Sequence, residues 1–287
     1  MTGHPARERM VQTDPRGLRL CVREHGIAKG IPVLILHGYL EQSAAWDPIA
    51  TGLAPRWVVA PDHRGHGRSD HVGLGGSYPF WDYVADVAAL VQELGGEVDL
   101  VGHSMGGTIA ALFAACRPNQ VRKLVLIEGL GPPNGESRAL TQARQALRQR
   151  LDPPAHRPLV DLDEAVVRMR RANPTLTEST ARTLAARTTR PLPDGGLTWT
   201  FDPLHRARSH QAFSADRFKS FLRAIEAPTL LIEGGSSPVQ GIPDLAERRA
   251  CLSQAEQIVL EGIGHHPHHE CPQALIALLK EHLNARC

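Results

Sequence analysis

A serine stands at the centre of the segment Gly102-His103-Ser104-Met105-Gly106, which has the spacing G-x-S-x-G. An apolar strand pattern precedes this segment and an apolar helical pattern follows it, so Ser104 should lie on a sharp turn between the two. Glycine on either side lets the segments pass closely, and the amide of Met105 would face a developing oxyanion. The pattern predicts a nucleophilic serine; the alternative is a simple helix cap.

A serine hydroxyl is a poor nucleophile until a base takes its proton, and His265 is the candidate base. It follows the glycines of Gly262-Ile263-Gly264, which come directly after a predicted strand at 257–260. The carboxyl ends of parallel strands meet at one edge of a sheet. His265 should therefore reach the same edge as Ser104.

Histidines are frequent beside the candidate base, and a metal site is the alternative interpretation of the segment 265–271. Pro267 interrupts helical spacing, however, and no distant set of Cys or His partners accompanies the segment. We therefore expect no metal and no cofactor. The remaining histidines are expected to line a pocket wall or to face solvent: His266, His268 and His269.

Short apolar runs alternate with helical patterns along the chain, which predicts an α/β fold with a mostly parallel sheet flanked by helices. Strands are expected over 31–36, 57–60, 98–101, 123–127, 228–234 and 257–260, and helices over 80–94, 108–115 and 272–283. Alternation of apolar and polar residues over 10–25, with a turn at 15–17, predicts an antiparallel hairpin at the sheet edge.

Two further loops should leave the sheet at the same edge. His37 and Gly38 end the strand at 31–36, so the amide of Tyr39 is the candidate for a second oxyanion donor beside that of Met105. The loop 62–70 holds closely spaced glycines but lacks a complete phosphate-binding motif. We interpret that loop as structural.

Residues 134–217 differ from the rest of the chain. Helical patterns alone occupy 137–151, 163–172 and 177–186. We interpret 134–217 as an inserted, mainly helical cap, or lid, on a core formed by 1–133 and 218–287. Its apolar stripes predict that leucines, Trp199 and Phe213 face the nucleophile.

The charge of the cap also differs from that of the core. It holds 14 Arg and no Lys against 9 Asp plus Glu, which gives +5 in a chain of net charge +2. We favour a solvated helical surface over a funnel for an anionic substrate.

The composition excludes several classes of function. Hydrophobic residues make up 42% and charged residues 22%, no apolar run could span a bilayer, and the near-neutral charge argues against nucleic-acid binding. The start of the chain lacks a signal-like apolar segment, so a cytoplasmic location is expected. Five scattered cysteines predict free thiols. A small molecule is the expected partner, and the oligomeric state stays open.

Taken together, the motifs resemble those of the α/β-hydrolase fold family over nearly the whole chain. The matching pieces are His37-Gly38, Asp62-x-Arg64-Gly65-His66-Gly67-x-Ser69, Gly102-x-Ser104-x-Gly106 and Gly264-His265-x-x-His268-x-Glu270-x-Pro272. In that family the nucleophile, an acid and a histidine follow one another along the chain, and a helical cap commonly follows the sixth strand. Members with haloalkane or epoxide substrates use Asp where Ser104 stands.

The position of the acid departs from the common family pattern. The turn after the seventh strand usually carries Asp, yet here Ser237 stands in the turn 234–238. A minority of members place the acid after the sixth strand, where this chain has Glu128. The resemblance is therefore greatest to the serine hydrolase-like subgroup. The alternative is that Glu128 pairs with an arginine at the cap hinge and that Asp244 is the acid.

The resemblance implies a serine hydrolase that cleaves a carboxylic ester-type bond of a small, partly apolar substrate through an acyl-enzyme. Ser104 would attack, His265 would move the proton, Glu128 would orient the imidazole, and the amides of Tyr39 and Met105 would hold the oxyanion. A thioesterase, a lactonase or a C-C bond hydrolase stays open on the same fold. A non-catalytic ligand receptor or interaction module is the alternative from another class.

Overall fold

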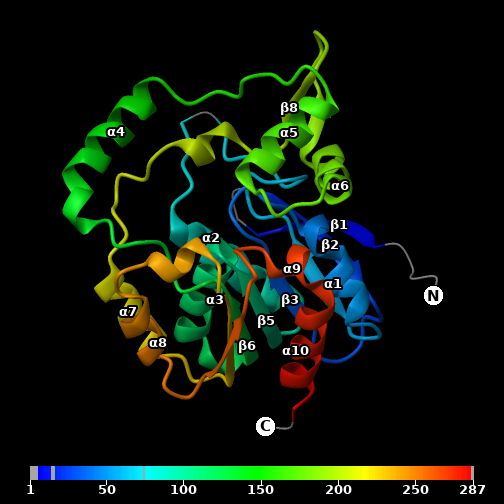
Figure 1. Ribbon diagram of the computed structural model, residues 1–287, viewed down its shortest axis with the longest axis vertical. Helices are drawn as coiled ribbons and strands as arrows, with labels where there is room; N and C mark the ends of the chain where they lie inside the picture. Colours follow the sequence, from blue (N-terminus) through cyan, green and yellow to red (C-terminus); the bar gives the residue numbers. More distant parts are fainter. Residues whose placement is uncertain (1–5, 14–16, 74, 286–287) are drawn as a thin grey trace.

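A computed structural model describes residues 6–13, 17–73 and 75–285. In this part of the chain, eight strands form one sheet in the order β1-β2-β4-β3-β5-β6-β9-β10 (Figure 1). The strands are β1 (Arg7–Gln12), β2 (Arg19–His25), β3 (Val33–Leu36), β4 (Val58–Pro61), β5 (Val98–His103), β6 (Val121–Ile127), β9 (Thr229–Gly234) and β10 (Glu256–Leu260). Only the pairs made by β2 are antiparallel, so the predicted mostly parallel α/β fold is confirmed.

The predicted N-terminal hairpin corresponds to β1 and β2. Residues 14–16, which include most of its predicted turn, lie outside the described residues.

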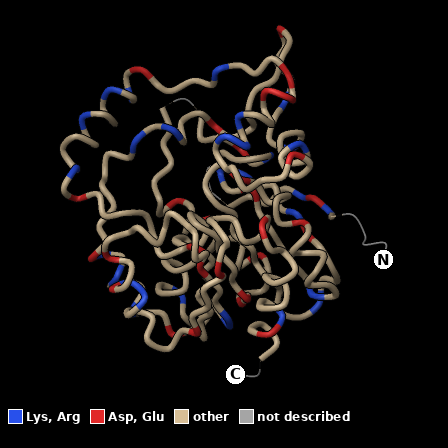
Figure 2. Tube along the Cα trace, in the orientation of Figure 1, with Lys and Arg blue, Asp and Glu red and all other residues tan. Residues whose placement is uncertain are grey.

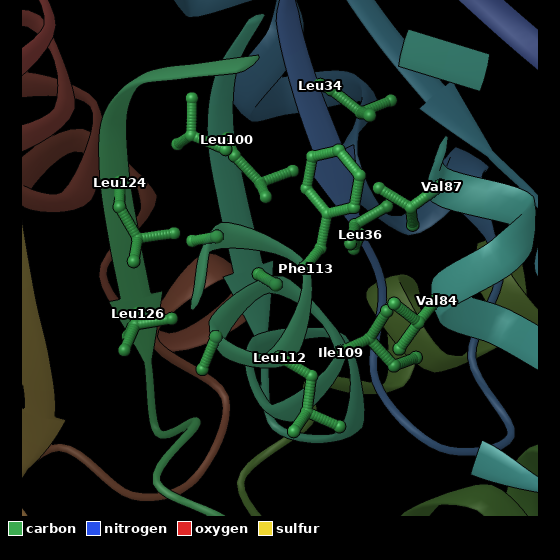
Figure 3. Packing of buried hydrophobic residues seen from close by; sticks show 14 of the residues in the cluster. Leu34, Leu36, Val84, Val87, Leu100, Ile109, Leu112, Phe113, Leu124 and Leu126 are labelled. Carbon is green, nitrogen blue, oxygen red and sulfur yellow. The ribbon is translucent and has the colours of Figure 1, made fainter. Parts of the chain in front are cut away.

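The central strands are apolar on both faces because helices cover both sides of the sheet. Successive residues of β3 alternate: Leu34 and Leu36 belong to one core cluster, and Val33 and Ile35 belong to the other. The helices α2 (Phe80–Glu93), α3 (Met105–Cys116) and α7 (Ala215–Arg223) pack on the first face. The helices α1 (Asp47–Gly52) and α10 (Pro272–Asn284) pack on the second. Figure 3 shows Phe113 of α3 packed among side chains of β3 and α2.

The sequence patterns predict α2, α3 and α10 but not α1 or α8 (Leu245–Ala250). Six residues are fewer than two helical turns and leave too little periodicity to recognise. The same applies to the short helices at the sheet edge and in the loops: η1 (Ser43–Trp46), η2 (Pro118–Gln120), η5 (Pro238–Gly241) and α9 (Pro267–Glu270).

Between β6 and α7 the chain forms helices that lie over the carboxyl edge of the sheet. They are η3 (Glu136–Arg138), α4 (Ala139–Leu151), α5 (Leu162–Ala172), α6 (Glu178–Thr188) and η4 (Pro203–Arg206), with the strand pair β7 (Thr189–Pro191) and β8 (Leu197–Trp199). A small apolar core joins α5, α6 and β8. By contrast, α4 stands apart from them (Figure 1), and Figure 2 shows basic residues spaced along it.

Asp47, at the start of α1, links the cap to the core. It accepts hydrogen bonds from Arg187 of α6 at 2.7 Å, from Arg23 of β2 at 2.7 Å and from His25 at 3.1 Å. Burial opposes its ionisation, but these hydrogen bonds outweigh burial and lower the pKa of Asp47 to about 2. The Asp47 carboxylate therefore accepts hydrogen bonds from two residues of the core, Arg23 and His25, and from one residue of the cap, Arg187.

We expect Asp47→Asn to lower the free energy of unfolding by roughly 2 kcal/mol at neutral pH, because charged hydrogen bonds are lost and the partly buried Arg23 keeps its charge. A folded-state pKa below the unfolded value means that this stability is present above the unfolded pKa and is lost as pH falls. The difference from wild type, measured by urea unfolding, should therefore narrow as pH falls from about 4 towards the folded-state pKa of about 2. Asp163→Asn, at an exposed ion pair with Arg182, is the matched control and should change little.

None of the helices in the described residues is long and apolar enough to cross a membrane. Four of the five cysteines are free thiols, as predicted: Cys21, Cys116, Cys251 and Cys271. Cys287 lies outside the described residues.

Candidate active site

Ser104 occupies the tight turn between β5 and α3. Its backbone has φ 51° and ψ −113°, a conformation that L-residues rarely adopt. A Cβ on Gly102 would lie 2.4 Å from the carbonyl oxygen of Gly106, and a Cβ on Gly106 would lie 2.2 Å from that of Leu36. Both glycines are therefore required by close backbone approach, as the G-x-S-x-G spacing predicts.

The structure brings Ser104, His265 and Glu128 together at the carboxyl edge of the sheet. His265 Nε2 lies 2.9 Å from Ser104 Oγ, and His265 Nδ1 lies 2.8 Å from Glu128 Oε2. The serine follows β5, the carboxylate follows β6 and the histidine follows β10. With its N–H on Nδ1, the imidazole can accept the serine proton at Nε2. This geometry suits nucleophilic attack by the serine oxygen.

Glu128 is buried and held by several donors. It has φ 54°, accepts a hydrogen bond of 2.6 Å from the amide of Gly234, and accepts another from the hydroxyl of Ser237. Burial alone would raise the pKa of Glu128, but the hydrogen bonds from His265, Ser237 and Gly234 outweigh it and lower that pKa. The carboxylate is thus ionised when it faces the imidazole.

The alternative acid, Asp244, makes a different interaction. Its two carboxylate oxygens accept hydrogen bonds of 2.9 Å and 2.8 Å from the buried guanidinium of Arg248. Arg248 also donates to the backbone carbonyls of the segment 130–132, at the hinge that leads into the cap. The arginine expected at that hinge is therefore present, but it pairs with Asp244 and not with Glu128.

The amides of Tyr39 and Met105 are the candidate oxyanion donors. The amide of Gly38 donates to Glu41 at 2.8 Å, and that of Leu40 donates to His66 Nε2 at 3.3 Å. Within the described residues, the Tyr39 and Met105 amides donate to no protein acceptor. The neighbours of Tyr39 are thus engaged, and the Tyr39 amide is left for a ligand. The side chain of Tyr39 contacts the cap: its hydroxyl donates a hydrogen bond of 2.8 Å to the backbone carbonyl of His205.

A pocket of about 410 Å³ opens beside Ser104 between core and cap. The apolar side chains that line it come from both: Leu40, Ala45, Met169, Ala172, Leu176 and Leu184. Its size falls within the range typical of small-molecule sites. A larger and more polar hollow, near Arg64 and Arg150, includes none of the three residues of the Ser104 cluster.

The prediction that Trp199 and Phe213 face the nucleophile is wrong. Trp199 packs against Phe201 in the core of the cap, and Phe213 packs against Phe218 of α7. Neither lines the pocket at Ser104. An apolar stripe shows that a face is buried but not what buries it, and here the helices α5 and α6 supply the pocket wall.

Side chains of the loop 62–70 make hydrogen bonds and ion pairs within the protein. Asp62 accepts hydrogen bonds of 2.8 Å from the amides of Ser43 and Arg68. Arg64 forms a buried ion pair with Asp86 of α2 at 2.7 Å. These side chains stabilise the conformation of the loop. Gly65 and Gly67, which have positive φ, form its turn.

Of the three histidines after His265, only His268 departs from its predicted position. His266 and His269 do line the pocket, but His268 is buried and stacks on Trp46 with ring centroids 4.3 Å apart. Burial lowers the pKa of His268 well below its usual value, so the imidazole is neutral.

Glu41 and His103 complete a group around these histidines that the sequence analysis missed. Glu41 contacts His103, His266 and His268. The statement that no distant partners accompany the histidine segment is therefore wrong. Glu41 follows a different strand and has no recognisable spacing to 265–271, so only the fold reveals the contact.

Comparisons with known proteins agree with the fold. The family described as alpha/beta hydrolase fold matches residues 31–272. A serine hydrolase-like protein of Danio rerio is 30% identical, over 90% of this chain and 83% of its own length. The 2-(acetamidomethylene)succinate hydrolase of Mesorhizobium japonicum is 28% identical, over 93% and 92%. Among solved structures, a thioesterase domain from the curacin biosynthetic pathway has a TM-score of 0.86 and 33% identity, over 96% of this chain and 99% of that one.

Proposed function

The chain belongs to the α/β hydrolase fold family. We propose that it cleaves a carboxylic ester-type bond of a small, partly apolar substrate through an acyl-enzyme. Its relatives identify it as a hydrolytic enzyme close to the serine hydrolase-like group. One observation carries the proposal: Ser104 Oγ, His265 and Glu128 form a continuous hydrogen-bonded series beside an apolar pocket.

Acylation follows from the atoms of this series. Ser104 Oγ attacks the substrate carbonyl carbon while its proton passes to His265 Nε2, and Glu128 stabilises the imidazolium that forms. The carbonyl oxygen becomes an oxyanion held by the amides of Tyr39 and Met105. The tetrahedral intermediate then collapses: the bond to the leaving group breaks, and the leaving oxygen takes the proton from His265.

Deacylation repeats the same steps with water. His265 Nε2 accepts a proton from water as the water oxygen attacks the acyl carbon, and the same amides hold the second oxyanion. Collapse of this intermediate breaks the bond to Ser104 Oγ, which recovers its proton from His265. The carboxylic acid leaves and the enzyme returns to its starting state.

The pocket sets the expected substrate class. Aliphatic side chains from core and cap face the space beside Ser104, while the histidines and Tyr39 add polar groups near the reacting centre. A short or medium acyl chain would bury apolar surface there. A thioester is the second candidate substrate, because the similar curacin domain is a thioesterase. Thioester cleavage would use the same nucleophile and the same oxyanion donors.

A panel of aryl esters of increasing acyl length, acyl thioesters and lactones tests the proposal on wild type and on Ser104→Ala. We expect ester turnover with a maximum at one acyl length and none in the variant. Faster turnover of thioesters than of esters would identify the protein as a thioesterase. Failure to turn over any member and to react with a serine-directed phosphonate would overturn the hydrolytic assignment.

Acid should lower the rate, because a protonated His265 cannot accept the proton of Ser104. Glu128, whose pKa is lowered by its hydrogen bonds, stays ionised and is not expected to cause the fall. We expect log kcat/KM for an aryl ester to decline with a slope of about one on the acidic limb of the profile. A profile without an acidic limb would contradict His265 as the base.

A further inference from the structure

A carboxylate and three imidazoles converge next to the proposed active site: Glu41, His103, His266 and His268. One nitrogen or oxygen ligand atom from each lies within 4.8 Å of all the others. Glu41 Oε2 is 3.3 Å from His103 Nδ1, and Glu41 Oε1 is 3.2 Å from His266 Nδ1 and 3.3 Å from His268 Nε2. Four ligands from three separate segments of the chain thus surround one small volume.

The protein surroundings of His103 prepare it to bind a cation. Its Nε2 lies 2.8 Å from the carbonyl oxygen of His265, which can only accept, so Nε2 carries the hydrogen. Nδ1 faces Glu41 Oε2, which also only accepts, so the two atoms share a proton that an incoming cation would displace in order to take the Nδ1 lone pair. A metal-binding histidine commonly donates its other N–H to a backbone carbonyl in this way.

His268 supplies a second and independent observation. Its side chain is 1% exposed, and neither ring nitrogen has a hydrogen-bond partner among the described residues. Stacking on Trp46 fixes the ring plane, and Nε2 lies 3.3 Å from Glu41 Oε1 without forming a hydrogen bond. A buried imidazole without hydrogen bonds is costly, and a bound cation would give its nitrogen a partner.

We propose that Glu41, His103, His266 and His268 form a binding site for a divalent transition-metal ion, with Zn²⁺ as the expected ion. Three imidazoles and one carboxylate suit Zn²⁺, whereas Mg²⁺ and Ca²⁺ prefer sets of oxygen ligands. Two ligands held 2.0–2.1 Å from zinc at a tetrahedral angle lie about 3.3 Å apart. Glu41 Oε1 already has about that separation from His266 Nδ1 and His268 Nε2, while His103 Nδ1 lies 3.3 Å from the other oxygen, Oε2.

The placement of the ligands indicates what the ion does. Glu41 follows Tyr39 by two residues, His103 precedes Ser104, and His266 follows His265. The ion therefore joins the three loops that carry the proposed oxyanion donor, nucleophile and base. Binding only to the folded arrangement raises its stability, so saturating Zn²⁺ should raise the melting temperature.

The test uses the full chain after treatment with a chelator. We expect titration calorimetry with ZnCl₂ to give one ion per chain, and CoCl₂ to give the visible absorption of a tetrahedral site. Glu41→Gln and His268→Gln should each weaken Zn²⁺ binding by more than the roughly ten- to hundred-fold that losing a supporting residue costs. Both variants should also lose the zinc-dependent rise in melting temperature.

Three controls keep the result decisive. His269→Gln removes a histidine next to His268 that is outside the cluster, and it should bind Zn²⁺ as wild type does. If a buried substitution fails to fold, as judged by circular dichroism, His266→Gln replaces it, since His266 is partly exposed. Binding that survives in Glu41→Gln and is lost in His265→Gln would place the ion on the serine-histidine pair and overturn the proposal, as would the absence of Zn²⁺ binding by wild type.

Discussion

Ser104→Ala is expected to abolish ester turnover while the protein stays folded, with a loss on the order of a million-fold in kcat. Alanine has no oxygen to form the acyl bond, and His265 then has no proton to accept. The small side chain fits the strained turn at φ 51° as well as serine does, so the melting temperature should change little. Burst kinetics with an activated aryl ester and the mass shift from a fluorophosphonate measure the loss directly.

An exposed serine at the same edge of the sheet provides the matched control. Ser236 lies in the turn after β9, faces solvent and makes no side-chain contact with the three residues of the proposed triad. Ser236→Ala should keep wild-type turnover and phosphonate labelling. Labelling of Ser104→Ala at the wild-type rate would show that another residue is the nucleophile.

The central features of the site could be predicted from sequence because they depend on local backbone chemistry. Glycines at 102 and 106 are needed wherever a strand and a helix meet at a tight turn, and the contacts to Leu36 and Gly106 show why. Strand ends deliver Glu128 and His265 to the same edge, and parallel topology follows from the alternation of apolar runs and helical patterns. The spatial meeting of these residues is a consequence of the fold class.

The features that sequence failed to predict depend on packing between distant segments. The sequence gives no sign that Glu41 meets His266 and His268, since its loop follows β3 while theirs follows β10. Likewise, Trp199 and Phe213 have the apolar character of pocket residues, but they fill the interior of the cap and the surface of α7. An apolar pattern in the sequence shows which face of a helix or strand is buried. Which segment packs against that face depends on the tertiary structure.

Glu128→Gln should slow ester turnover by roughly ten-thousand-fold at neutral pH without unfolding the protein. The carboxylate holds the N–H of His265 on Nδ1 at 2.8 Å and stabilises the positive ring in the transition state. An uncharged amide of nearly the same shape does neither reliably, because its NH₂ group can donate to Nδ1 and leave the hydrogen on Nε2. Stopped-flow or steady-state kinetics on the aryl ester, with circular dichroism as the check on folding, measure the effect.

Asp244→Asn is the matched control for this carboxylate. Asp244 pairs with Arg248 in the structure, so its loss should lower stability and leave turnover close to that of wild type. Wild-type turnover in Glu128→Gln, or an equal loss of turnover in Asp244→Asn, would refute the assignment of the acid.

The position of Ser237 allows a stronger test by rescue. Its hydroxyl donates to Glu128 Oε2, the same oxygen that His265 Nδ1 contacts, so residue 237 lies within one hydrogen bond of the acid position. Adding Ser237→Asp to Glu128→Gln places a new carboxylate at the turn where most of the family carries its acid. We expect the double variant to recover part of the lost rate, whereas Ser237→Asn in the same background should recover none, because only a negative charge stabilises the imidazolium.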